Sequence, residues 1–286
     1  MADTTPCAVH TLVEDIIHGR LGVSAAKATL AELDKDAPDV ARDLRADGQA
    51  IATAHKFDFS TWQGESMALS EVLLETGFDM IDAGVVALPY PEVVFCQRYP
   101  IDGGGHNDIV VLLRSVPDGD VTGIEYRAFH KCTNVPEWAH HGFTTTFRRN
   151  GGAHHWINDP SGVFDHEDQE YWLGCTMQFV VSALAALSSK GPEIHTRPAP
   201  KDLNKRRARK GKVPIFEYRI VEIPAWAKAK AEGLGGTHAS PRLHWRRGHV
   251  RHFRTGCTTL IRPCLVGAAE NGFIHKDYAV APVPAD

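Results

Sequence analysis

Long apolar runs are missing from this sequence of 286 residues. The longest candidate, from Phe179 to Leu187, has about half of the roughly 18 residues that a membrane-spanning helix needs, so it predicts a buried helix instead. The first residues, from Met1 to Pro6, lack the basic stretch and following apolar stretch that mark a secretion signal. We therefore expect no membrane partner and a cytoplasmic location.

Common nucleotide-binding and hydrolase motifs are missing as well. The chain has no Gly-x-x-x-x-Gly-Lys-Ser/Thr, no Gly-x-Gly-x-x-Gly and no Gly-x-Ser-x-Gly, which excludes P-loop ATPases, Rossmann enzymes and α/β-hydrolases. Which cofactor the chain uses, if any, stays unknown.

Cysteine pairs with metal-binding spacing are also missing. The six cysteines form no Cys-x-x-Cys pair, and they predict single buried thiols rather than disulfides. The spacing of His244, His249, His252 and Cys257 fits no standard zinc pattern, so no metal is expected.

Positive charge is scarce in the first part of the chain and negative charge is scarce in the last part. The small net charge of −4 conceals this separation. From Lys190 to the end there are 19 lysines and arginines against 8 aspartates and glutamates, while the first 189 residues hold 12 against 27. Such a separation is expected where one part of a protein meets a polyanion. The alternative is that the two parts neutralise each other by docking.

The expected elements are helices first and strands afterwards, which is typical of an α+β fold. Four helical segments are expected: a run around residues 13–17, residues 25–33 with Ser24 as N-cap, residues 38–54 with Pro38 in the first turn, and residues 66–81. Short β-rich runs separated by Pro, Gly, Asp and Asn then predict an antiparallel meander at 92–99, 108–116, 123–130 and 142–148. A long, largely apolar helix at 168–188 closes this part.

The remaining residues predict a small basic module. We expect a basic helix at 202–209, a strand at 215–223, a loop at 224–241 and strands at 249–254, 258–265 and 272–280. This gives two domains: an acidic α+β body over 1–189, helical over 1–84 with a sheet and a long helix over 85–189, and a basic, β-rich α+β module over 190–286.

Two basic constellations in this module predict contact with phosphate groups. Residues 205–212 carry six positive charges, whose mutual repulsion phosphates would relieve. In residues 244–252, arginine side chains can hold phosphate in two hydrogen bonds, and Trp245 offers a face on which a base can stack. The predicted phosphate-binding residues are Lys205, Arg206, Arg207, Arg209, Lys210, Trp245, Arg246, Arg247, His249, Arg251 and Arg262.

Histidines are dense in the acidic part, which leaves an enzyme open as an alternative. They are His106, His130, His140, His141, His154, His155 and His166. In a nucleotide- or nucleic-acid-processing enzyme, His249 would act as general acid or base. Its partner would be a His or Asp from the acidic part. None of these histidines has a diagnostic ligand spacing, so no catalytic residue is named.

The C-terminal pattern resembles a set of uncharacterised proteins from tailed phages and prophages. The resemblance rests on Leu203 to Arg206, on His244-x-Arg-Arg-Gly-His249-x-Arg251, on Arg262-Pro-Cys-Leu-Val-Gly267 and on Gly272 to Tyr278. It implies a phage protein acting in the host cytoplasm, and it carries over no catalytic residue.

Our main hypothesis is therefore a phage-encoded protein that binds DNA or RNA through its basic module. The alternatives are the enzyme above and a host-interaction protein, for counter-defence or takeover, whose acidic part binds a host protein. The oligomeric state is left open.

Overall fold

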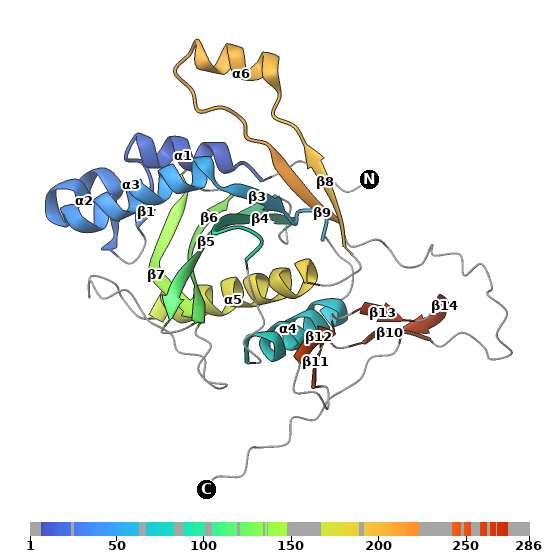
Figure 1. Ribbon diagram of the computed structural model, residues 1–286. Helices are drawn as coiled ribbons and strands as arrows, with labels where there is room; N and C mark the ends of the chain where they lie inside the picture. The colour runs from blue at the N-terminus through green and yellow to red at the C-terminus, as the bar shows by residue number, and fades with distance from the viewer. Residues whose placement is uncertain are drawn as a thin grey trace, which may run out of the picture.

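The computed structural model describes residues 7–23, 26–62, 67–82, 88–100, 105–118, 121–133, 135, 137–147, 167–188 and 192–222, together with five C-terminal strands. A nine-stranded sheet runs through the body in the order β2-β1-β7-β6-β5-β4-β3-β9-β8 (Figure 1). Its strands are β1 Gly22–Val23, β2 Ala28–Thr29, β3 His55–Asp58, β4 Glu92–Pro100, β5 His106–Asp118, β6 Val121–Cys132, β7 Ala139–Phe147, β8 Glu193–Arg197 and β9 Tyr218–Glu222.

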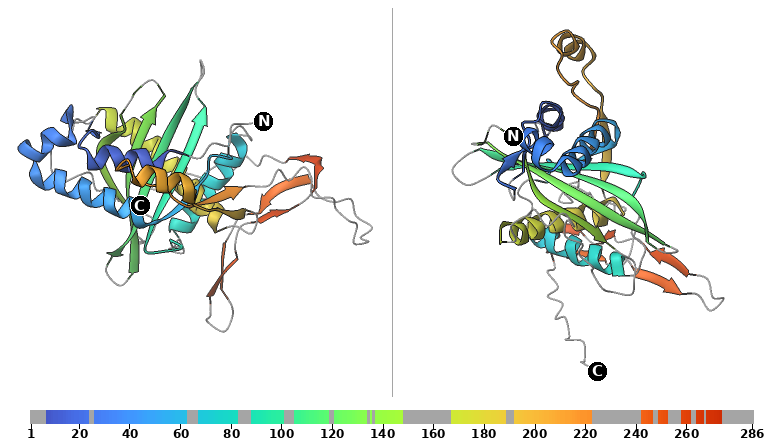
Figure 2. Two further views of the ribbon diagram at one scale, coloured as in Figure 1. Left: turned by 90° about the horizontal axis from the view of Figure 1, so that it is seen from above. Right: turned by 90° about the vertical axis from the view of Figure 1, so that its left-hand side faces the viewer.

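Helices cover both faces of this sheet. The helices are α1 Val9–Ile17, α2 Leu30–Asp36, α3 Pro38–Thr53, α4 Met67–Asp82, α5 Glu167–Leu187 and α6 Lys201–Ala208. Helices α1 to α3 lie on one face, and α4 and α5 on the other (Figures 1 and 2). The expected α+β class is confirmed, and none of the helices in the described ranges combines the length and apolarity that crossing a membrane requires.

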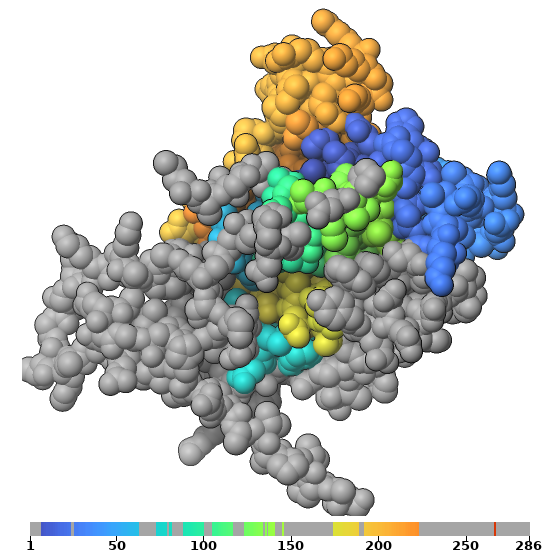
Figure 3. Space-filling model, turned by 180° about the vertical axis from the view of Figure 1, so that it is seen from behind, coloured from blue at the N-terminus to red at the C-terminus, as the bar shows by residue number. Residues whose placement is uncertain are grey.

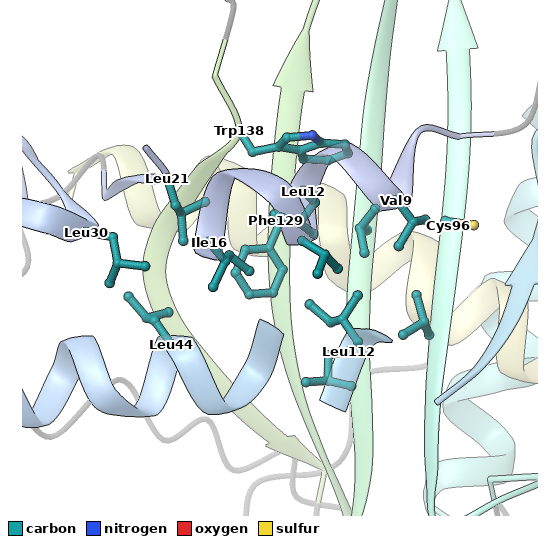
Figure 4. Close-up of a cluster of buried hydrophobic side chains, with 14 of the residues drawn as sticks. Val9, Leu12, Ile16, Leu21, Leu30, Leu44, Cys96, Leu112, Phe129 and Trp138 are labelled. Atoms are coloured by element: carbon teal, nitrogen blue, oxygen red, sulfur yellow. The ribbon is translucent and has the colours of Figure 1, made fainter. Parts of the chain in front are cut away.

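The central strands are apolar on both faces because each face has its own core. In β5, Val110 and Leu112 pack with α1 and α3, whereas Val111 and Leu113 pack with α4 and α5. Figure 4 shows the first of these cores, in which Trp138 lies over α1. A strand buried on both faces reads as a continuous apolar run, which is why these strands are easy to recognise in the sequence.

The predicted meander is confirmed. Strands β4 to β7 are antiparallel neighbours in sequence order, with Phe95 opposite Val111 and Val111 opposite Ala128. The predicted helices over residues 38–54, 66–81 and 168–188 correspond to α3, α4 and α5. The basic helix corresponds to α6, and the strand expected at 215–223 corresponds to β9.

The prediction of an entirely helical N-terminal part was wrong, because this part also contains the strands β1, β2 and β3. Thr29, and not Ser24, caps α2, because its backbone N–H donates to Glu32 (2.7 Å) while the Glu32 N–H donates to its hydroxyl. Strand β3 pairs in parallel with β4 and β9. It was missed because three of its four residues are polar, so no β pattern stands out.

Beyond residue 190, the chain continues the same sheet before it reaches the C-terminal strands. Strand β9 pairs with β3, and β8 pairs with β9 at the edge. The last strands are β10 Arg242–Arg246, β11 His249–His252, β12 Thr258–Ile261, β13 Cys264–Val266 and β14 Ala268–Phe273. They form two small sheets, β13-β10-β14 and β11-β12. The loop expected at 224–241 lies outside the described residues, and the domain boundary after residue 189 stays a prediction.

We expect Gly77→Ala to destabilise the protein because Gly77 lies where α4 meets α5. A Cβ atom there would lie 2.5 Å from the carbonyl oxygen of Val181, a contact that forces the helices apart. The expected loss is about 1–3 kcal/mol of unfolding free energy, measured by urea denaturation. Gly174→Ala in α5 is the matched control, since nothing lies within 4 Å of its Cβ position. It should be neutral or stabilising by up to about 1 kcal/mol; equal losses in the two variants would contradict this account.

Candidate functional site: a basic arm and the pocket at its base

Residues 198–217, here called the arm, connect β8 to β9 and stand away from the body (Figures 1 and 3). Helix α6 occupies the outer end. The chain reverses directly after it at Gly211, which has a positive φ of 64° and donates its N–H to Ala208. Glycine adopts this left-handed conformation without steric cost, so the helix ends here and the chain returns toward β9.

One side of α6 faces the rest of the protein and makes specific hydrogen bonds. The Asn204 side chain exchanges two hydrogen bonds with the backbone of Ile215, both of 2.8 Å. Arg207 donates to the Val213 carbonyl (2.7 Å) and to Glu14 of α1 (2.6 Å). The same Glu14 oxygen also accepts the backbone N–H of Val213 at 3.1 Å. Glu14 therefore links both α6 and the segment that returns from it to the body.

The opposite side of α6 presents unpaired positive charges. Five cations on α6 and on the turn that directly follows it are exposed and make no ion pair with any residue that the structure describes: Lys201, Lys205, Arg206, Arg209 and Lys210. At about 100° of rotation per residue they span roughly half of the helix circumference, with Asp202 as the acidic residue among them. Lys212, just beyond the helix, is exposed as well. The result is a basic ridge without internal neutralisation.

A pocket of about 380 Å³ lies at the base of the arm. Its walls are mostly apolar and come from the arm itself, through Leu203 and Phe216, and from α1, β4 and β9. Arg98 and Arg197 add two cationic groups to this lining, as does the ring of His10. Burial, with a further contribution from Arg207, lowers the pKa of His10, so its ring is neutral near pH 7. The pocket suits an apolar group that carries or adjoins a negative charge.

Buried hydrogen bonds hold the Arg98 guanidinium in place at the pocket. Arg98 donates to both carboxylate oxygens of Asp108, at 2.7 and 2.8 Å. Its backbone N–H donates to the Ser60 hydroxyl (2.9 Å), which in turn donates to Asp58. Burial raises the pKa of Asp58. Because the partners are themselves buried, this arginine is fixed before any ligand arrives.

Cys7 lines the pocket but is unsuited to act as a nucleophile. Its side chain is buried, and burial raises the pKa of its thiol well above the ordinary value. A thiol that stays protonated near neutral pH does not attack substrates readily. The chemistry that the pocket offers is therefore binding.

Lys56 supports the pocket from behind Phe216. Its ammonium lies 4.2 Å from the centre of the Phe216 ring and donates to the carbonyl oxygens of Ala52 and Ala54. Burial lowers the pKa of Lys56 to about 8. Neither Lys56 nor the Arg98 cluster was predicted as functional. The contact of Lys56 with Phe216 and that of Arg98 with Ser60 join segments that lie far apart in the sequence.

The residues predicted to bind phosphate fall into three groups. Lys205, Arg206, Arg209 and Lys210 lie on the exposed ridge, whereas Arg207 lies on the bonded side of the same helix. Trp245 and Arg246 are placed in β10, His249 and Arg251 in β11, as strand positions alone. Arg247 and Arg262 lie outside the described residues. The binding role of the whole set stays a prediction.

The histidines of the acidic part form no metal site within the described ranges. His130 and His140 are buried, and His140 hydrogen-bonds the Ala128 carbonyl at 2.9 Å while His130 contacts the Thr176 hydroxyl at 3.4 Å. No group of three or more potential ligands occurs among the residues that the structure describes. His154, His155 and His166 lie outside the described residues.

The comparison with protein families identifies this chain. The model of the anti-CRISPR type V subtype A2 family (AcrVA2-like) matches residues 66–268. This chain belongs to that family. The match runs from α4 to β14 and includes the whole arm, while α1 to α3 precede it. No curated protein and no solved structure matches the chain.

Membership of the AcrVA2-like family supports the expectation of a phage protein that counters host defence. It favours the host-interaction alternative over our main hypothesis of nucleic-acid binding. The matched segment contains most of the C-terminal pattern on which the phage resemblance rested, apart from residues 272–278. It also shows that the family segment includes the arm but not its anchor Glu14.

Replacing Glu14 by alanine should loosen the arm without unfolding the body. The change removes the acceptor of both Arg207 and the Val213 N–H, so amide hydrogen exchange should accelerate at Val213 and along α6. We expect at least a roughly tenfold faster exchange there, from the loss of about 1.4 kcal/mol or more of local stability. Asp43→Ala, at an exposed position of α3, is the control and should leave arm exchange unchanged. Unchanged exchange at Val213 in the Glu14 variant would refute the anchoring role.

Proposed function

We propose that this AcrVA2-like protein counters a type V CRISPR defence by binding a protein of that defence in the host cytoplasm, through the arm and its pocket. The family match supports the biological setting. The observation that supports the surface is the juxtaposition of an apolar pocket with a ridge of cations that have no described ion-pair partner. Interfaces are commonly centred on an apolar anchor in a pocket with charged groups around it.

The chemistry of the surface defines the partner segment. An apolar side chain would enter between Leu203 and Phe216, and acidic groups beside it would meet Arg98 and the ridge. The fixed guanidinium of Arg98 lowers the entropic cost of pairing with a carboxylate. We therefore expect the partner to present an acidic segment with an exposed apolar residue.

The acidic N-terminal part is less suited to serve as the main contact. Several of its carboxylates are engaged internally, such as Asp47 with Arg114 and Arg127, and Asp34 with Arg45. On α2 and α3 the exposed acidic residues alternate with Lys35 and Arg42. The ridge carries charge of nearly one sign, so it steers a partner more strongly.

The test compares variants of the pocket and of the ridge. Leu203→Glu should block the apolar pocket, and Lys205→Glu with Arg206→Glu and Arg209→Glu should reverse the ridge. We expect both to lower recovery of the type V effector protein in pull-downs by about tenfold or more, and to abolish protection of phage in a host that carries the system. Lys35→Glu with Arg42→Glu, which reverses two exposed cations on α2 and α3, is the control for charge reversal on another surface.

We expect each variant to melt at the temperature of the unchanged protein, because the substituted side chains are exposed or line the surface pocket. Full protection of phage by the Leu203 and ridge variants would overturn the proposed surface. Full protection by the control and loss in both others would support it.

A second candidate is contact between the ridge and a nucleic-acid backbone. It is favoured by the five exposed cations of the ridge, whose repulsion bound phosphates would relieve. CRISPR effectors hold a guide RNA and a DNA target in extended, phosphate-rich duplexes. The remaining predicted contacts with nucleic acid are Trp245, Arg246, Arg247, His249, Arg251 and Arg262. A processing enzyme using His249 stays a further prediction.

Fluorescence anisotropy with labelled single- and double-stranded DNA and RNA separates the two candidates. If the ridge tracks phosphates, affinity should fall steeply between about 50 and 300 mM salt, and the triple ridge variant should flatten that slope by about two to three units. Arg246→Glu with Arg247→Glu should weaken binding further. Leu203→Glu adds one carboxylate to the same helix and should flatten the slope by about one unit at most, although it impairs the protein contact. Absence of binding to every probe at low salt would eliminate the nucleic-acid candidate.

A further inference from the structure

Strand β8 is an uncovered edge of the nine-stranded sheet. It pairs with β9 on one side, and no strand that the structure describes lies along its other side. All five of its residues are exposed, including Ile194 with 49% of its surface accessible. Figure 1 shows β8 at the outer border of the sheet, beyond the layers of helices. An edge of this kind offers unpaired backbone donors and acceptors to another strand.

The charges on β8 are unbalanced in the single chain. Glu193 lies directly opposite Glu222 of β9, so two carboxylates face each other. His195 lies 3.4 Å from the Glu193 carboxylate and 3.8 Å from that of Glu222. Arg197 makes no ion pair with any described residue. Like charges directly opposite in a sheet are destabilising, and a further cation next to Glu193 would relieve them.

We propose that two copies of this chain pair through β8, antiparallel and centred on His195. In that register Glu193 lies opposite the partner subunit's Arg197, and Ile194 lies opposite the partner subunit's Thr196. Two-fold symmetry repeats each contact, which is the self-complementarity that a symmetric dimer requires. The opposite charges at equal distances from His195 select this register and the antiparallel direction over others.

The pairing joins the two nine-stranded sheets edge to edge and keeps the basic ridges apart. Each arm follows the C-terminal end of β8, so antiparallel strands place the two arms at opposite ends of the joint. Repulsion between the ridges is thereby reduced. Since the strands are short and exposed, the dimer is weak and depends on concentration. Its use is that one dimer presents two pockets and two ridges, which strengthens binding to a target with repeated sites.

The test measures mass by sedimentation velocity over a wide range of concentrations of the full chain. Arg197→Glu and Glu193→Arg each create two like-charged pairs across the joint, and each should raise the dimer dissociation constant about tenfold or more. The double variant, Glu193→Arg with Arg197→Glu, restores opposite charges and should recover dimerisation. An equimolar mixture of the two single variants should also dimerise, because only the mixed pair is complementary.

These four samples distinguish pairing from a folding defect, since a merely structural effect of either single substitution would not be reversed by the second. Recovery in both the double variant and the mixture supports the proposal. A wild-type chain that remains monomeric at every concentration overturns it, and leaves the edge to a strand of another protein. A dimer that Arg197→Glu leaves unchanged also overturns it, because that dimer uses another surface.

Discussion

Burial of the central sheet on both faces is the constraint on which the rest of the structure depends. Strands β4 and β5 place alternate side chains in two separate cores. A slip of the register by one residue would therefore move these apolar side chains from each core to the opposite face of the sheet. The same packing fixes α1 across the sheet, with Leu12 and Ile16 inserted beside Phe129 (Figure 4). Because α1 carries Glu14 on its outer side, the position of the arm follows from the packing of this core.

Buried ion pairs restrict how α3 can be placed on the sheet. Asp47 of α3 is almost fully buried and receives Arg114 from β5 and Arg127 from β6, at 2.7 and 2.8 Å. Removing charges from water costs free energy that the pairing largely offsets, so such a group contributes little net stability. It does exclude positions of α3 that would leave Asp47 unpaired. The Arg98–Asp108 pair likewise favours one register, that of β4 against β5. It also places the Arg98 guanidinium at the pocket.

The elements that the sequence revealed are those with a strong local signal. Residues 92–147 alternate apolar runs with Pro, Gly and Asp, and Pro38 marks the start of α3, so these elements were predictable. Strand β3 has no such signal, and its place between β4 and β9 depends on parallel pairings over long distances along the chain. The pocket is equally hidden, because Cys7 and Phe216 lie about 200 residues apart and meet only in the folded sheet. The basic stretch was visible, but its division into bonded and free sides required the contacts of Arg207 and Asn204.

That division bears on how the charge separation along the chain arose. If the acidic and basic parts existed only to neutralise each other, the cations of α6 should face acidic groups of the body. Arg207 does so through Glu14, yet five neighbouring cations point away and have no described ion-pair partner. Holding them together on one short helix and the turn after it costs electrostatic free energy that the fold does not recover. Docking between the two parts therefore explains the anchor of the arm, whereas the ridge requires negative charge from another molecule.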